Sequence, residues 1–303
     1  AGQTGHRTQA ARIPALGLSQ RELDQFARNV RLQNALGIPS RCVTSAEAKE
    51  IAPLVNTGRL MGGAFCPTDG HANPFLVTQA YAEAARNLGV EVCLRTEVTG
   101  IMLRRGRVAG VKTDRGRIET RVVVNAAGAH APLLGAMVNL ALPIRPERHQ
   151  ILVTEPVEPM LGPMVMSFSY DLYCQQTPHG SFLMGYGDPS EPEGYNERSS
   201  WEFLEEMAAK ATWLLPPLGH LRVVRQWAGL YDLTPDRQPI LGETQEVPGF
   251  FLAVGFSGHG FMIAPMVGRL IAESVVGREP SLPVHLDLGR FARGELVMEP
   301  SVV

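Results

Sequence analysis

Residues 249–277 read GFFLAVGFSGHGFMIAPMVGRLIAESVVG, and this stretch decides the fold. The apolar run GFFLAVGF predicts a buried strand, 257–260 a glycine turn, and 261–276 a helix closed by Gly277. Three glycines within 255–260 would leave backbone N–H groups free at the helix N-terminus, where the partial positive charge suits an anion. On spacing alone the pattern fits a simple strand-to-helix turn equally well, and it lacks the lysine of a Walker phosphate loop.

Toward the N-terminus, local signals predict three helices and four strands, while the first eighteen residues show no periodicity. The helix signals are the capping boxes 19–22 and 44–47 and the N-cap with first-turn proline at 73–74. These helices should end at Gly37, before Pro53 and at Gly89, respectively. The predicted strands are VEVCLRTEV (90–98), GIMLRR (100–105), RVAGVKTD (107–114) and RIETRVVV (117–124).

Two further features define the predicted organisation. Val122–Ala126 is an unbroken apolar run, typical of a strand buried on both faces, and it ends in NAAGA, whose small residues allow a bound group to approach the backbone. From Leu142 onward, QILVTEP, DLYCQQTP and SFLMGYGDP predict antiparallel strands, with one helix at Ser199–Leu215. We therefore expect two domains. One comprises 63–140 and 228–303, the other 19–62 and 141–227, and residues 1–18 are irregular.

Composition excludes several classes of protein. The chain has 303 residues, 45% hydrophobic and 19% charged, which is ordinary for a two-domain globular protein. The net charge of −2 gives no reason to expect nucleic acid or an anionic membrane as a partner. No apolar run reaches the length of a membrane span, and no secretory signal is recognised. The four cysteines are scattered without a CxxC pair, which predicts reduced cytoplasmic thiols and no metal site.

Seven segments occur in an order that carries a resemblance. They are PTDGHANP, EVTGI, VVVNAAGA, RPERHQI, GLYDLTPDRQPILG and GFSGHGF, with the helix that follows the first of them. This series resembles the D-amino-acid-oxidase/sarcosine-oxidase superfamily, above all the β subunits of hetero-oligomeric sarcosine oxidases and related proline dehydrogenases. The resemblance extends from about Arg21 to Phe291. It implies an α/β plus α+β fold, with a Rossmann-like FAD-binding domain and a substrate domain built on a mixed, largely antiparallel sheet.

The resemblance also implies a cofactor site and a reaction. The residues that would line FAD are Val98, Ala127, Gly128, Ala129, Gly242, Gly258, His259, Gly260 and Phe261. The reaction would be hydride removal from the carbon next to the nitrogen of a sarcosine- or proline-like amine, followed by hydrolysis of the imine. Gly229 stands where monomeric sarcosine oxidases carry a flavin-linked cysteine, so we expect non-covalent FAD. FMN in a hetero-oligomer stays open, because His71 lies close to the start of a helix that carries an FMN-linked histidine in some relatives.

Four residues are candidates for contact with the substrate. Arg148 and His149 stand at the entrance of a predicted strand, where they either face the active site or form a solvated edge. Tyr173 lies in a predicted strand of the substrate domain, where superfamily members direct a tyrosine at the substrate, although a core tyrosine fits as well. Tyr231 replaces the arginine of glycine and D-amino-acid oxidases, and its hydroxyl could donate to a carboxylate.

The sequence also departs from the family pattern. Met262 replaces a lysine that helps to bind the substrate carboxylate in monomeric sarcosine oxidases. The family begins with a strand, a G-x-G-x-x-G turn and a helix that grip the FAD pyrophosphate, and we find no counterpart. We expect either that this βαβ segment is truncated, which we favour, or that another chain supplies it. The alternative functions are a non-catalytic scaffold subunit and, with less support, a nicotinamide-dependent dehydrogenase; oxidase and dehydrogenase are not separable.

Overall fold

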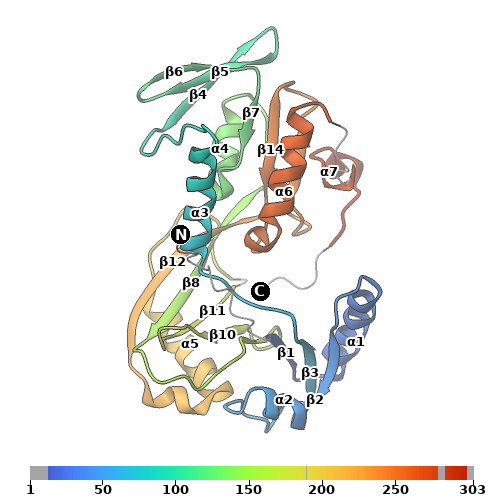
Figure 1. Ribbon diagram of the computed structural model, residues 1–303, viewed down its shortest axis with the longest axis vertical. Coiled ribbons are helices and arrows are strands. Elements are labelled where there is room, and N and C mark those ends of the chain that lie inside the picture. The colour runs from blue at the N-terminus through green and yellow to red at the C-terminus, as the bar shows by residue number, and fades with distance from the viewer. Residues whose placement is uncertain (1–12, 189, 279–283, 299–303) are drawn as a thin grey trace.

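An eight-stranded sheet forms the lower half of the computed structural model, which describes residues 13–188, 190–278 and 284–298 (Figure 1). Its strand order is β12-β8-β11-β10-β9-β1-β3-β2. All neighbours are antiparallel except β1 and β9, which confirms the predicted mixed, largely antiparallel sheet. The strands are β1 (Ile13–Gly17), β2 (Arg41–Thr44), β3 (Gly62–Cys66), β8 (Arg145–Thr154), β9 (Val165–Ser167), β10 (Leu172–Gln176), β11 (Phe182–Tyr186) and β12 (Val223–Leu233).

One face of this sheet is covered and contains the larger core. Side chains alternate along each strand, so on β10 Leu172 and Cys174 are buried while Tyr173 points to the other face and is half-buried. The covered face packs on α5 (Trp201–Leu214), whose Phe203 and Met207 are buried, and the same core includes residues of α2 (Ser45–Ile51). Helix α1 (Gln20–Ala35) packs beside β1–β3, and a short 3-10 helix, η2 (Pro216–His220), follows α5. The opposite face of the sheet holds Tyr173.

The upper half contains two smaller sheets and a second core. In one sheet β14 (Phe250–Val254) pairs in parallel with β7 (Val123–Asn125) and antiparallel with β13 (Ile240–Glu243). The other is an antiparallel meander, β4 (Val98–Arg104), β5 (Arg107–Thr113) and β6 (Gly116–Glu119). The remaining elements are α3 (Pro74–Asn87), η1 (Gly128–His130), α4 (Ala131–Ala136), α6 (Gly260–Val275), η3 (Val284–Leu286) and α7 (Arg290–Arg293). Phe250, Leu252 and Ile240 lie at the centre of this core.

The helix starts predicted from capping patterns are confirmed, and one of them gives a simple stability test. The Thr44 hydroxyl accepts from the Glu47 N–H, and the Glu47 carboxylate accepts from the Thr44 N–H, which closes the first turn of α2. Thr44→Ala is therefore expected to lower the free energy of unfolding by about 1 kcal/mol, measured by urea denaturation. Thr78→Ala, an exposed threonine within α3, is the control, because alanine favours a helix. Equal midpoints for the two variants would contradict the role of the cap.

Three predictions about the sheets need correction. Residues 1–18 were expected to be irregular, yet Ile13–Gly17 form β1, which is inserted between β3 and β9; residues 1–12 lie outside the described part. Of the predicted strand at 90–98 only Val98 is in a strand, because residues 90–97 find no partner in the described chain and leave Leu94 69% exposed. The run Val122–Ala126 is not buried on both faces, because Val124 is 41% exposed; among the described strands β7 pairs with β14 alone.

The upper half is consequently open on one side. Val124 of the edge strand β7 is 41% exposed, and every residue of α3 is at least partly exposed, with Phe75 at 82%. Both β7 and α3 therefore leave apolar side chains exposed in the described structure. The predicted boundaries at 63 and 228 also fall inside β3 and β12, two strands of the eight-stranded sheet. Residues 279–283 and 299–303 of the predicted first domain lie outside the described part.

Candidate active site

The turn between β14 and α6 is shaped by residues with positive φ. Gly255, Ser257 and Gly258 have φ of 75°, 51° and 95°, so the chain reverses tightly before the helix begins. A Cβ on Gly258 would lie 2.9 Å from the Tyr231 ring, which brings the turn into contact with β12. His259, the N-cap of α6, makes no side-chain capping hydrogen bond in the described structure. The first amides of this sixteen-residue helix are thus presented to an acceptor outside it.

The buried carboxylate of Asp232 holds this turn in place. Its Oδ2 accepts a hydrogen bond from the Gly255 N–H at 2.7 Å, and its Oδ1 accepts from the Ser257 N–H at 3.3 Å. Burial raises the pKa of Asp232 above its usual value, although these backbone donors act in the opposite direction. Sequence analysis did not select Asp232. The sequence feature that could have identified Asp232 is an acidic residue at the end of an apolar strand, just before the Thr234-Pro235 turn.

Three of the predicted site residues meet on the face of the large sheet that lies opposite α5. The ring of His149, on β8, stacks on Tyr231 of β12 with centroids 4.4 Å apart and on Tyr173 of β10 with centroids 5.8 Å apart. The His149 Nε2 and the Tyr173 hydroxyl are 3.1 Å apart and share a hydrogen bond. Burial lowers the pKa of His149 from 6.5 to about 4, so the imidazole is neutral at neutral pH. We refer to Tyr173, His149 and Tyr231 as the His149 stack.

Arg148 points away from the His149 stack, because consecutive residues of a strand face opposite sides of the sheet. Its Nε and NH2 donate to the Glu191 carboxylate at 2.8 and 2.9 Å, and its NH1 donates to the Arg198 carbonyl. It lines a cavity of about 240 Å³ between the sheet and the start of α5, together with Gln150 and Tyr186. Arg148 and His149 therefore face opposite sides of the sheet, whereas the sequence alone gave the same two alternatives for both residues.

The segment after β7 places the predicted Ala127, Gly128 and Ala129 next to the same strands. Asn125, fully buried, accepts from the Ala127 N–H and donates to the Ala131 carbonyl, which fixes this bend. Gly128 has φ of 53°, and a Cβ there would meet no atom within 4 Å. The following 3-10 helix η1 contacts both β8 and β12. This glycine-containing backbone thus faces open space near the His149 stack.

The other predicted cofactor residues lie in different elements. Val98 begins β4 and pairs with Thr113 in the separate meander. Gly242 lies within β13, opposite Leu252, with φ of 106°. Gly260 and Phe261 belong to the first turn of α6, where Phe261 is 46% exposed.

Comparison with known proteins establishes the family. The sequence model described as "DAO: FAD dependent oxidoreductase" matches residues 3–274. The chain belongs to this family.

Other members of the DAO family resemble the chain over most of its length. Sarcosine oxidase subunit beta of Rhodobacter capsulatus is 31% identical over 288 residues, which cover 94% of this chain and 69% of the relative. The crystal structure of L-proline dehydrogenase from P. horikoshii matches with a TM-score of 0.92 and 39% identity, covering 97% of this chain and 79% of that one. Glycine oxidase from Geobacillus kaustophilus matches with a TM-score of 0.85 and 26% identity, covering 95% and 77%. The resemblance predicted from seven short segments is confirmed, and so is the fold class.

DAO-family membership makes this chain, by family, an FAD-dependent oxidoreductase of the amine and amino-acid type. The geometry fits such a cofactor. The uncapped N-terminus of α6, the open backbone at Gly128 and the ring of Tyr231 would present amide donors and a flat aromatic surface to a planar, electron-rich group. Within the described residues, none of the helices has the length and apolar character needed to span a bilayer.

Proposed function

We propose that this chain binds FAD without a covalent link and oxidises a secondary amine or amino acid of the sarcosine or proline type. One observation carries the proposal: Tyr231 joins the His149 stack to the glycine turn at Gly258, with 2.9 Å between its ring and a Cβ placed there. A substrate held against the stack would therefore lie beside a cofactor held at the turn. FAD, when bound, supplies a hydride acceptor for the carbon next to the substrate nitrogen, and the resulting imine hydrolyses in water.

The backbone of this chain would hold the flavin. The N–H groups of Gly258, Gly260 and Phe261, at the start of α6, carry the partial positive charge that favours the anionic edge of a reduced flavin. Ala127, Gly128 and Ala129 would lie along the cofactor, where the absence of large side chains permits close approach. Gly242 and Val98 remain assigned to the cofactor on the family pattern.

The His149 stack would orient the substrate. Because the pKa of His149 is about 4, its ring places no positive charge beside the substrate ammonium, and the two tyrosine faces attract a cation. The hydroxyls of Tyr173 and Tyr231 are the donors available for a substrate carboxylate, since Arg148 is bound to Glu191 on the opposite face. Burial raises the pKa of both tyrosines, so each hydroxyl keeps its proton.

The exposed apolar surfaces of β7 and α3 are the basis for a proposal about partner polypeptides. Two relatives are named as subunits, a sarcosine oxidase subunit beta and a hydrogen cyanide synthase subunit of Pseudomonas protegens. We therefore propose that this chain also functions in a hetero-oligomer, with further polypeptide beside β7 and α3. FMN in such an assembly stays a prediction attached to His71, whose two ring nitrogens are buried and lack a hydrogen-bond partner in the structure.

The visible absorption spectrum tests the function. We expect the chain to hold FAD when a strand, a G-x-G-x-x-G turn and a helix precede it, because that unit binds a dinucleotide pyrophosphate. Anaerobic sarcosine or proline should then bleach the visible absorption of the bound flavin. Acid-precipitated protein should be colourless, since the flavin is not covalently bound.

The opposite results are equally informative. If the extended chain retains no flavin, the catalytic proposal fails and the scaffold alternative replaces it. Yellow protein that neither amine bleaches would reject the substrate class and keep the cofactor. Colour that remains with the acid precipitate would reject the non-covalent link.

A further inference from the structure

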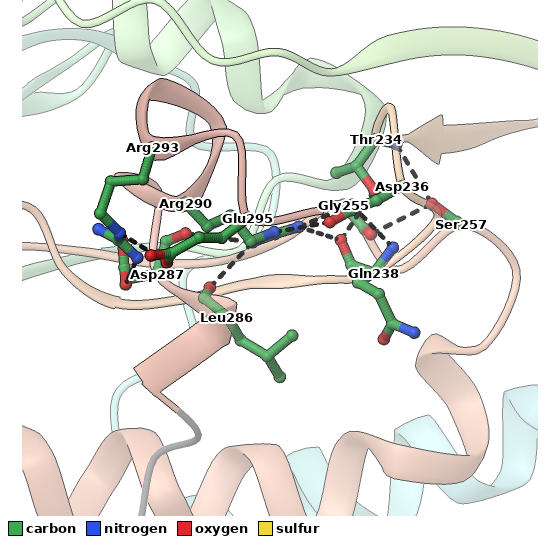
Figure 2. Close-up of polar contacts among 10 residues, drawn as sticks. All are labelled: Thr234, Asp236, Gln238, Gly255, Ser257, Leu286, Asp287, Arg290, Arg293 and Glu295. Carbon is green, nitrogen blue, oxygen red and sulfur yellow. Dashed lines mark hydrogen bonds and ion pairs between the residues drawn. The ribbon is translucent and has the colours of Figure 1, made fainter. Parts of the chain in front are cut away.

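Arg290 is a fully buried arginine whose hydrogen-bonding capacity is completely used (Figure 2). Its Nε and NH2 donate to the two carboxylate oxygens of Asp236 at 2.8 and 2.9 Å, and NH2 also donates to the Gln238 carbonyl at 2.8 Å. Its NH1 donates to the carbonyls of Leu286 and Asp287 at 3.1 and 3.2 Å. A guanidinium has five N–H donors, and these five bonds engage all of them.

The partner carboxylate organises the loop between β12 and β13. Asp236 is fully buried, and its Oδ1 also accepts from the Gln238 N–H at 3.2 Å. The Thr234 hydroxyl donates to the Gln238 carbonyl at 2.8 Å, and Arg237 sits between them with φ of 62°. Burial tends to raise the pKa of Asp236, but the hydrogen bonds and charge of Arg290, together with the bond from the Gln238 N–H, hold that pKa below its usual value. The loop therefore depends on an ionised carboxylate that only Arg290 neutralises among its hydrogen-bond partners.

This loop lies directly against the glycine turn that precedes α6. The Thr234 N–H donates to the Ser257 hydroxyl at 3.2 Å, as Figure 2 shows. A Cβ on Gly255 would come within 2.4 Å of the Thr234 methyl group, so the loop and the turn have no free space between them. A continuous series of contacts thus runs from Arg290 through Asp236 and Thr234 to the turn.

We propose that Arg290 is a positioning residue, through which the C-terminal arm (residues 284–298) fixes the backbone of the glycine turn that faces the flavin. The hydrogen bonds of Arg290 reach the turn through the loop at 234–238, and Leu286 of the arm also packs against the cluster that Phe256 of the turn joins. Arg290 itself therefore acts on the turn through other residues. The expected effect of Arg290 on flavin binding rests on the function proposed above. Its expected effect on the backbone of the glycine turn does not depend on that function.

Arg290→Lys tests the backbone effect in the full chain without flavin. Lysine keeps the positive charge but replaces five fixed donors by a single ammonium, so it cannot hold two carboxylate oxygens in one plane. Amide hydrogen exchange should become about tenfold faster at 234–239 and 255–260 and stay unchanged in β10 and β11. The matched control is Arg293→Lys on the same arm, where the arginine is 40% exposed and pairs with Asp287 and Glu295. It should leave both segments unchanged.

Two outcomes would overturn the proposal: unchanged exchange at 255–260, or equal acceleration in β10 and β11, which would mean that Arg290 supports the fold as a whole. If Arg290→Lys does not fold, Asp236→Asn removes the same pairing with a side chain of the same size. It should produce the same local pattern.

A separate measurement addresses the flavin. In the chain extended as above, Arg290→Lys should release FAD about tenfold faster than the Arg293→Lys control. Equal release rates would reject the link from Arg290 to the flavin even if exchange is locally faster. If the extended wild-type chain holds no FAD, the proposed function fails, while the exchange data still decide the role of Arg290.

Discussion

Gly258→Val is expected to destabilise the folded chain by about 3 kcal/mol, the sum of a backbone and a packing effect. The φ of 95° at this position is costly for any residue with a Cβ. The new Cβ would also lie 2.9 Å from the Tyr231 ring, and that ring cannot withdraw because it stacks on His149 at 4.4 Å. Urea denaturation followed by far-UV circular dichroism measures the change.

The comparison with two other glycine variants separates the two effects. Gly258→Ala adds the same Cβ without the further methyl groups, so it should lie between wild type and Gly258→Val. Gly268→Ala adds a Cβ within α6 where nothing lies within 4 Å, and it should be stabilising by about 0.5–1 kcal/mol because alanine favours a helix. A Gly258→Val protein as stable as wild type would mean that Tyr231 does not pack on the turn.

Acidification is expected to weaken the fold through His149, by up to about 3 kcal/mol at pH 4 and below. Burial lowers the pKa of this imidazole from 6.5 to about 4, so the folded state resists a proton that the unfolded state accepts. Above pH 6.5 neither state is protonated and the full stability is present. As the pH falls from 6.5 toward 4, protonation of the unfolded chain removes that stability progressively.

The measurement compares wild type with His149→Phe over this pH range. Other acids titrate there too, so the difference between the two proteins isolates the imidazole. The phenylalanine variant should have the flatter stability curve, and NMR of ¹³C-labelled histidine should show one wild-type resonance titrating near pH 4, which the variant lacks. Tyr173→Phe removes the hydroxyl bonded to Nε2 without removing the imidazole, so it should retain the steeper curve. Identical curves for wild type and His149→Phe would show that this histidine is not buried as a neutral ring.

The helices and the glycine turn could be predicted from sequence because their signals are local. Ser19 and Thr44 each accept from a backbone N–H three residues on, and the glycines at 255 and 258 take φ values that other residues avoid. Strands need partners that local sequence does not contain. Residues 90–97 have a strand pattern but no neighbour in the described structure, whereas β1 was missed because its partners come from β3 and β9.

The residues of the candidate site also divide into those that local sequence can indicate and those whose role depends on the fold. His149, Tyr173 and Tyr231 were selected one at a time, and only the register of β8, β11, β10 and β12 shows that they share a face. That register also turns Arg148 to the opposite side. Asp232 and Arg290 were missed because their importance depends on the backbone that surrounds them, and a charged residue read alone is most simply a solvated one.

The pairing of β1 with β9 has a consequence for the order in which the chain folds. Ala15 lies opposite Met166, so β1 can complete its hydrogen bonds only after the chain has passed β9. Contacts so distant in sequence are slow to form, because a long loop must close first. Until then β1 has only β3 beside it among the described strands, so the eight-stranded sheet cannot be completed. A chain interrupted before Val165 should therefore expose the edge of β1 and depend on chaperones, even though every helix-capping signal up to that point is already in place.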